Sequence, residues 1–187
     1  MSESLAVISE YLGIQEDIEL VKCSIQYLFE QQNLDGSWYY SSSATGKWID
    51  NFHTGYVLVS LKKMMDVSQS MRHRALLEKG LDFHIKNHYT AASIPKYYTT
   101  SLYPIDTHCF AQSIITFTEF GDLGFATKLI DGAIDLMYNT PQRYFIYSIR
   151  KHYKVKTNLL RWCNAYMFWA LANFMRAAEK ERYWVCH

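Results

Sequence analysis

The stretch QQNLDGSW, residues 31–38, joins two helical segments and gives the first indication of how the chain is organised. The preceding residues, 16–32, have apolar side chains at the spacing of an amphipathic helix. The Asp-Gly pair favours a tight turn, and the amide of Gln32 can bond backbone groups that the helix end leaves free. Trp38 can then stack beside the next helix. We interpret the stretch as the turn of a helical hairpin, with a structural role.

Helical periodicity recurs along the chain in two alternating kinds of segment. One kind is amphipathic, with its charges on one side. The other is apolar nearly all round, which predicts burial on more than one face. The amphipathic segments are residues 16–32, 72–88 and 125–139, and the apolar segments are 52–64, 108–120 and 164–175.

The repeat has a regular period. Asp50, Asp106 and Trp162 lie 56 residues apart, at the starts of the three apolar segments. A period of this length predicts one helical hairpin per repeat, stacked in an array or a closed ring. With 187 residues, 49% of them hydrophobic and 16% aromatic, the chain can bury a sizeable core. We predict a single domain over residues 1–187 with three repeats, at about 16–65, 72–120 and 123–178.

Charge and composition exclude several classes of protein. The formal net charge is +1, which gives no global electrostatic reason to expect a nucleic-acid partner. The basic run at 150–156 is either a local anion-binding patch or a solvated loop. No apolar run reaches the ~20 residues of a membrane span. The beginning of the chain lacks the basic region of a signal peptide, and the four cysteines are far apart. These features predict a cytoplasmic protein with reduced thiols.

The turn resembles the QW motif of the terpenoid cyclases and prenyltransferases, which are α/α toroids. The residues that match the motif are Leu28, Gln32, Gly36 and Trp38. Residues 79–87 are similar to its first half, with Asn87 in place of Gln. The resemblance implies a toroid architecture. It does not imply terpene chemistry, because the sequence has no D-x-D-D or D-D-x-x-D run.

A second resemblance covers roughly residues 15–178. It rests on the segments WIDNFHTGYVLVSL (48–61), SLYPIDTHCFAQSI (101–114) and RWCNAYMFWAL (161–171). These are similar to toroid proteins encoded among bacterial polysaccharide-biosynthesis genes, whose barrels look like those of six-hairpin glycosidases. This chain resembles their C-terminal half. The resemblance implies an all-α fold in which tandem helical hairpins form an arc of an α/α toroid, and a role in polysaccharide metabolism.

Polar and aromatic residues gather at the starts of the three apolar segments. The candidate catalytic residues are Asp50, His53, Asp106 and His108, and the candidate substrate-binding residues are Trp48, Tyr103, Arg161 and Trp162. Carboxylates beside an aromatic platform suit sugar binding and glycoside hydrolysis. A histidine base suits an epimerase or a lyase instead. The alternative is that both aspartates only cap helices, where the helix dipole favours them.

Zinc held by Asp106, His108, Cys109 and His53 is a further alternative, although we expect neither a metal nor a cofactor. The expected function is that of a carbohydrate-active or carbohydrate-binding protein that takes a saccharide ligand. Other possible functions are a non-catalytic scaffold or subunit, or an isoprenoid-binding toroid. An arc of hairpins leaves apolar flanks uncovered. We therefore expect a homodimer, or completion of the ring by another chain.

Overall fold

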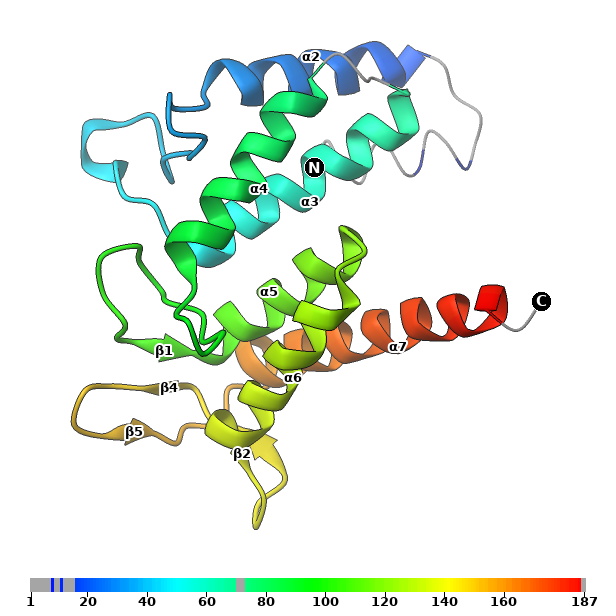
Figure 1. Cartoon of the computed structure of the whole chain (residues 1–187). Helices are drawn as coiled ribbons and strands as arrows, with labels where there is room; N and C mark the ends of the chain where they lie inside the picture. Colours follow the sequence, from blue (N-terminus) through cyan, green and yellow to red (C-terminus); the bar gives the residue numbers. More distant parts are fainter. Residues whose placement is uncertain (1–7, 9–10, 12–15, 70–72, 186–187) are drawn as a thin grey trace. The chain divides into compact units, whose positions relative to one another are not determined.

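The computed structural model describes residues 8, 11, 16–69 and 73–185. These residues are mainly helical, with a small antiparallel sheet region (Figure 1). The long helices are α2 (Glu16–Glu30), α3 (Asn51–Ser68), α4 (Arg74–His88), α5 (Thr107–Glu119), α6 (Leu123–Met137) and α7 (Ala165–Val185). Two short helical elements are η1 (Ala44–Gly46) and η2 (Leu160–Asn164). Each of the predicted helical segments falls on one of the long helices, so the mainly helical character is confirmed.

The chain divides into two compact units. Unit 1 comprises residues 1–49 and 53–87, and unit 2 comprises residues 50–52 and 88–187. The short segment at the start of α3 therefore belongs with the later helices. The predictions of a single domain and of three stacked repeats depend on how the two units combine. Both stay predictions.

In unit 1 the turn after α2 is held by side chains that bond to backbone. The Gln32 amide donates to the carbonyl oxygens of Gly36 and Leu76, at 3.0 Å each. The buried Trp38 donates from its indole Nε1 to the Leu28 carbonyl at 2.8 Å. A Cβ added to Gly80 of α4 would lie 2.4 Å from the Trp38 ring, so only glycine admits the ring there. These contacts support a structural role for the turn.

Gly36 is the second glycine that the turn requires. Its φ of +97° is a conformation that side chains rarely adopt. Next to it, Asp35 accepts hydrogen bonds from the Ser37 amide at 3.0 Å and the Ser37 hydroxyl at 2.7 Å. Burial raises the pKa of Asp35, but these hydrogen bonds outweigh it and leave the pKa below its usual value. The Asp-Gly pair thus forms the turn as its sequence predicts.

Unit 2 is organised around α5. This helix packs against both α6 and α7 (Figure 1), and every residue from Thr107 to Thr118 is buried. The near-continuous apolar character of α5 therefore corresponds to burial all round, as predicted. The apolar segment of α7 differs, because it leaves Phe168, Trp169 and Met175 exposed.

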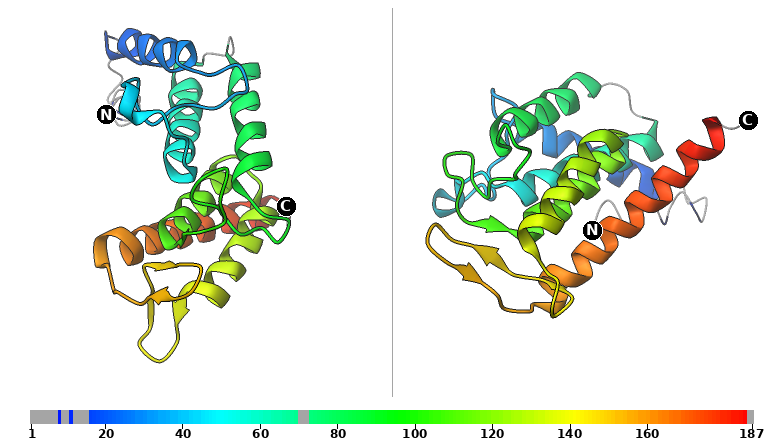
Figure 2. Two further views of the ribbon diagram at one scale, coloured as in Figure 1. Left: turned by 90° about the vertical axis from the view of Figure 1, so that its left-hand side faces the viewer. Right: turned by 60° about the horizontal axis from the view of Figure 1, so that its bottom comes forward.

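Two small antiparallel sheets in unit 2, one of three strands and one of two, were not predicted. Strand β1 (Ile105–Asp106) pairs with β4 (Ser148–Ile149), which pairs with β5 (Lys154–Val155); β2 (Tyr138–Asn139) pairs with β3 (Tyr144–Phe145). The β4–β5 hairpin extends away from α5, α6 and α7 (Figure 2). Each strand has only two residues, too few for the alternation that identifies a strand in sequence.

The register of the three-stranded sheet, formed by β1, β4 and β5, determines which side chains share a face. Asp106 lies opposite Ser148, and Ser148 lies opposite Val155. Directly opposed residues of antiparallel strands project to the same face, and residues two apart along a strand do so as well.

None of the helices among the described residues is long and apolar enough to cross a bilayer.

Candidate functional site

Asp106 lies at the junction of the sheet and α5 in unit 2. It ends β1 and caps α5, accepting a hydrogen bond from the His108 amide to Oδ1 at 2.8 Å. Asp106 therefore does cap a helix, and whether it has a further role stays a prediction. Asp106 is only 2% exposed, and burial raises the pKa of its carboxyl group to about 6, against the opposing effects of the His108 amide and Arg150. A carboxyl group with this pKa exchanges a proton near neutral pH, as general acid–base catalysis requires.

Asp50, the second candidate carboxylate, is buried in the same unit. It forms an isolated antiparallel bridge with Tyr98 immediately before α3. Burial raises the pKa values of the Tyr97 hydroxyl and the Cys109 thiol, and the charges of Asp50 and Asp106 both add to these increases. Because the charges of Asp50 and Asp106 affect the pKa values of the same two side chains, the two carboxylates lie in one region of unit 2.

His108 is enclosed by aromatic rings. Its Nδ1 lies 3.0 Å from the Trp162 carbonyl oxygen, which can only accept a hydrogen bond. Its ring stacks on the Trp162 ring with centroids 4.1 Å apart, and the Tyr166 ring lies 4.2 Å away. Phe52 contacts His108 edge-on at 5.0 Å. We call Phe52, His108, Trp162 and Tyr166 the aromatic cluster. With its ring fully buried in this cluster, His108 supports Trp162.

Three further predicted residues of unit 2 lie at the surface. Trp162, in η2, is 39% exposed although its ring stacks on His108. Arg161 precedes it and is exposed. Tyr103 is 36% exposed, and its backbone oxygen accepts from the Ser101 hydroxyl at 2.8 Å. Of these three, Trp162 alone belongs to the aromatic cluster, through its ring contacts with Phe52 and His108.

The two remaining candidates, Trp48 and His53, belong to unit 1. Trp48 stacks on Tyr40 with centroids 4.5 Å apart, and His53 contacts the edge of the same ring at 4.6 Å. His53 also lies edge-on to Tyr56 at 5.8 Å. The predicted set is therefore divided: two members share Tyr40 in unit 1, and six belong to unit 2.

The zinc alternative requires several ligands in one place. Among the described residues, no group of three or more His, Cys, Asp or Glu side chains could hold a metal ion. Cys109 is fully buried, and burial raises the pKa of its thiol well above the ordinary value, which disfavours the thiolate that zinc binds. The ligand grouping that zinc needs is thus not present in the described part of the chain.

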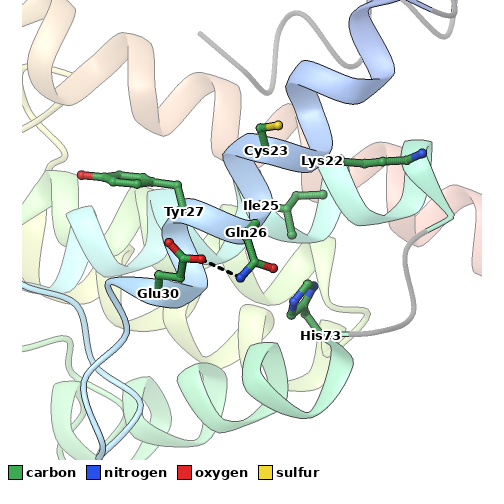
Figure 3. A pocket seen from close by; sticks show the side chains of 7 residues that line it. All are labelled: Lys22, Cys23, Ile25, Gln26, Tyr27, Glu30 and His73. Atoms are coloured by element: carbon green, nitrogen blue, oxygen red, sulfur yellow. Dashed lines mark hydrogen bonds between the residues drawn. The ribbon is translucent and has the colours of Figure 1, made fainter.

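Unit 1 carries an open cavity of about 470 Å³ that was not predicted (Figure 3). Its lining residues come from α2 and from the residue that precedes α4: Lys22, Cys23, Ile25, Gln26, Tyr27, Glu30 and His73. Several of its polar groups are already paired, since Gln26 donates to Glu30 at 2.8 Å and Lys22 bridges Glu19 at 2.7 Å. No candidate residue lies in it, and its mixed lining indicates no particular chemistry.

Sequence reasoning missed the neighbours that shape the unit 2 site. Tyr166 belongs to the aromatic cluster, with its ring centroid 4.2 Å from that of His108. The Tyr97 ring lies edge-on to Phe52 of the cluster, with centroids 5.4 Å apart. Ser148 lies opposite Asp106 in the sheet. The positive charge of Arg150 lowers the pKa of the Asp106 carboxyl group. The only signal was the basic, aromatic stretch at 150–156, which includes Arg150 but not Ser148. The position of Ser148 opposite Asp106 depends on the tertiary fold.

No protein-family model matches the chain, and no curated protein is significantly similar to it. The conclusions about function therefore rest on the residues themselves, above all on the buried Asp106 beside the aromatic cluster.

Proposed function

We propose that the protein is a carbohydrate-binding or carbohydrate-active protein of polysaccharide metabolism, and that unit 2 binds a saccharide beside Asp106 and Trp162. The observation that carries this proposal is the combination of a carboxyl group with a pKa of about 6 and a half-exposed indole in one unit. Sugars present both apolar C–H faces and hydroxyl groups, so an aromatic platform and a carboxyl group suit them together.

Trp162 is the proposed platform. Its ring is fixed by the stack on His108 at 4.1 Å and by the edge-on contact with Phe52 at 5.8 Å. A ring held on one side keeps its orientation in the free protein. Less conformational entropy is then lost when a ligand packs against its exposed part.

Asp106 is the proposed proton donor. In glycoside hydrolysis it would protonate the glycosidic oxygen as the C–O bond breaks, while water adds to the anomeric carbon and gives a proton to a second carboxylate. Asp50 is the proposed second carboxylate, because its charge and that of Asp106 both raise the pKa values of Tyr97 and Cys109. Without turnover, the same groups would bind sugar hydroxyls.

We also propose that the hairpins form an arc of an α/α toroid. The support is the alternation of amphipathic and apolar helices at a 56-residue spacing, together with the full burial of α5. In this arrangement α3, α5 and α7 would be the inner helices. Their beginnings would face the ligand.

The proposed function is tested by calorimetric titration of a panel of neutral and acidic oligosaccharides. Trp162→Ala should weaken binding of the saccharide that the native protein binds by about tenfold or more, as for loss of a stacking platform. Trp169→Ala is the matched control, because Trp169 is 43% exposed and its ring contact is with Tyr166. Equal effects of the two substitutions, or no binding by the native protein, would contradict the proposal.

A second candidate function is that of a non-catalytic subunit. It is favoured by the apolar surface of α7, where Phe168 is 75% exposed near Trp169 and Met175. We expect a second copy of the chain to cover this surface, since two-fold homodimers are the commonest soluble oligomers. Light scattering should then give a mass near twice 22.0 kDa, and Phe168→Glu should reduce it to that of a monomer. A native monomer at micromolar concentration would contradict this candidate.

A further inference from the structure

The β4–β5 hairpin of unit 2 is markedly basic. No Asp or Glu occurs between Asp135 and Glu179, although the chain as a whole has a net charge of only +1. The cationic residues in that interval are Arg143, Arg150, Lys151, Lys154, Lys156, Arg161 and Arg176. None of them forms an ion pair with a carboxylate among the described residues. An anion that reached this hairpin would therefore not have to displace a carboxylate from these side chains.

The register of the sheet places one of these cations on the face that carries Asp106. Ser148 lies opposite Asp106, and Arg150 follows Ser148 by two positions, so both project to that face. This position agrees with the effect of the Arg150 charge, which lowers the pKa of the Asp106 carboxyl group. Its amide donates to the Tyr153 carbonyl at 2.8 Å, which places Tyr153 opposite Arg150 at the hairpin end. Tyr153 is 64% exposed.

Ser148 gives an independent indication that this face meets a polar ligand. Its side chain is fully buried, and its hydroxyl has no hydrogen-bond partner among the described residues. A buried hydroxyl without a partner typically costs about 1–3 kcal/mol, so such groups are rare, and a polar ligand is one explanation for them. The strip from Asp106 through Ser148 to Arg150 and Tyr153 therefore combines a carboxyl group, a hydroxyl, a guanidinium and an exposed aromatic ring.

We propose that the saccharide bound by unit 2 is an acidic one, and that Arg150 binds its carboxylate while Tyr153 packs against a neighbouring sugar ring. This inference rests on the proposed function and specifies its ligand class. Guanidinium binds carboxylate through two parallel hydrogen bonds, which makes Arg the residue suited to the task. A single-stranded nucleic acid would also meet cations and aromatic rings here. The carboxyl group of Asp106 on the same face favours a sugar over a chain of phosphates.

The test uses the full chain and pairs of ligands that differ only in charge. The acidic ligands are oligomers of glucuronate, galacturonate and mannuronate. The neutral ligands are the same oligomers with each carboxylate reduced to a hydroxymethyl group. Affinities are measured by calorimetry for the native chain and for Arg150→Gln, Arg150→Lys and Lys156→Gln. Lys156→Gln is the matched control. Lys154 lies on the face of β5 opposite to the one that Ser148 and Arg150 share, and Lys156, two positions further on, continues this alternation.

We expect the native chain to bind at least one acidic oligomer about tenfold or more tightly than its reduced counterpart. Arg150→Gln should remove this preference, mainly by weakening the binding of the acidic oligomer. Arg150→Lys should keep part of the preference, and Lys156→Gln should keep all of it.

Equal affinity for acidic and neutral oligomers would overturn this inference and leave the proposed function standing. Equal losses in Arg150→Gln and Lys156→Gln would also overturn it, because the preference would then follow net charge. Binding to neither class would overturn the proposed function and the inference with it. Binding of an oligothymidylate that excludes the saccharides would identify a nucleic-acid site instead.

Discussion

Replacing Asp106 with Asn separates the charge of this residue from its role as a helix cap. The Asn Oδ1 can still accept the hydrogen bond that the His108 amide donates at 2.8 Å, and Asn is as good a cap as Asp. What the substitution removes is a carboxyl group whose folded-state pKa is raised from 3.8 to about 6 by burial. The variant is therefore expected to fold, and to differ from the native chain mainly in its dependence on pH.

The magnitude follows from proton linkage. A group whose pKa is raised on folding contributes stability that is fully present below the unfolded pKa and is lost as pH rises through the folded pKa. The difference between 3.8 and about 6 corresponds to about 3 kcal/mol at about 1.4 kcal/mol per pKa unit. The free energy of unfolding of Asp106→Asn, relative to the native chain, should therefore rise by about 2–3 kcal/mol between pH 4 and pH 8.

Urea unfolding followed by circular dichroism, at closely spaced pH values, measures this difference. Other titrating groups are common to both chains and cancel from the comparison. Asp122→Asn is the control, because Asp122 caps α6 by accepting from the Phe125 amide at 2.9 Å while its side chain is exposed. A difference between Asp106→Asn and the native chain that does not change with pH would refute the assignment of a raised pKa to Asp106.

Two further predictions concern stability. Burial lowers the pKa of His88 from 6.5 to about 4, so the native chain should lose about 3 kcal/mol of stability relative to His88→Gln as pH falls from 6.5 to 4. His88→Gln should remove this loss in urea unfolding, whereas the exposed His152→Gln should not; identical pH profiles would contradict the assignment. Gly80→Ala should destabilise by about 1–3 kcal/mol in thermal unfolding, because its Cβ would lie 2.4 Å from the Trp38 ring. Gly124→Ala should stabilise instead, since the nearest atom there is 3.7 Å away, and a stabilising Gly80→Ala would refute the contact.

The long helices could be predicted from sequence because each has many residues that repeat one pattern. Segment 108–120 is apolar on every side, and α5 is buried on every side. Segment 164–175 has the same composition, yet α7 leaves Phe168 exposed. Local composition measures the tendency to be buried, and the neighbouring elements decide whether burial occurs. That information is not local.

The candidate site was predicted only in part, for a related reason. Asp106 and Trp162 were identified by their regular spacing, and the structure adds that the first is buried and the second is stacked on His108. Ser148 and Arg150 were not predicted as site residues, because their relation to Asp106 comes from the pairing of β1 with β4. Two-residue strands leave no periodic signal, so their register follows from the tertiary fold.

The central claim, that a saccharide binds unit 2 beside Asp106 at the face of Trp162, is tested most directly by nuclear magnetic resonance. The five tryptophans give five indole N–H signals, and Trp162→Phe and Trp169→Phe assign the two that matter. Titration with the oligosaccharide that binds most tightly should shift the Trp162 signal in a saturable manner and leave the Trp169 signal in place. Saturable binding that leaves the Trp162 signal unmoved would contradict the account.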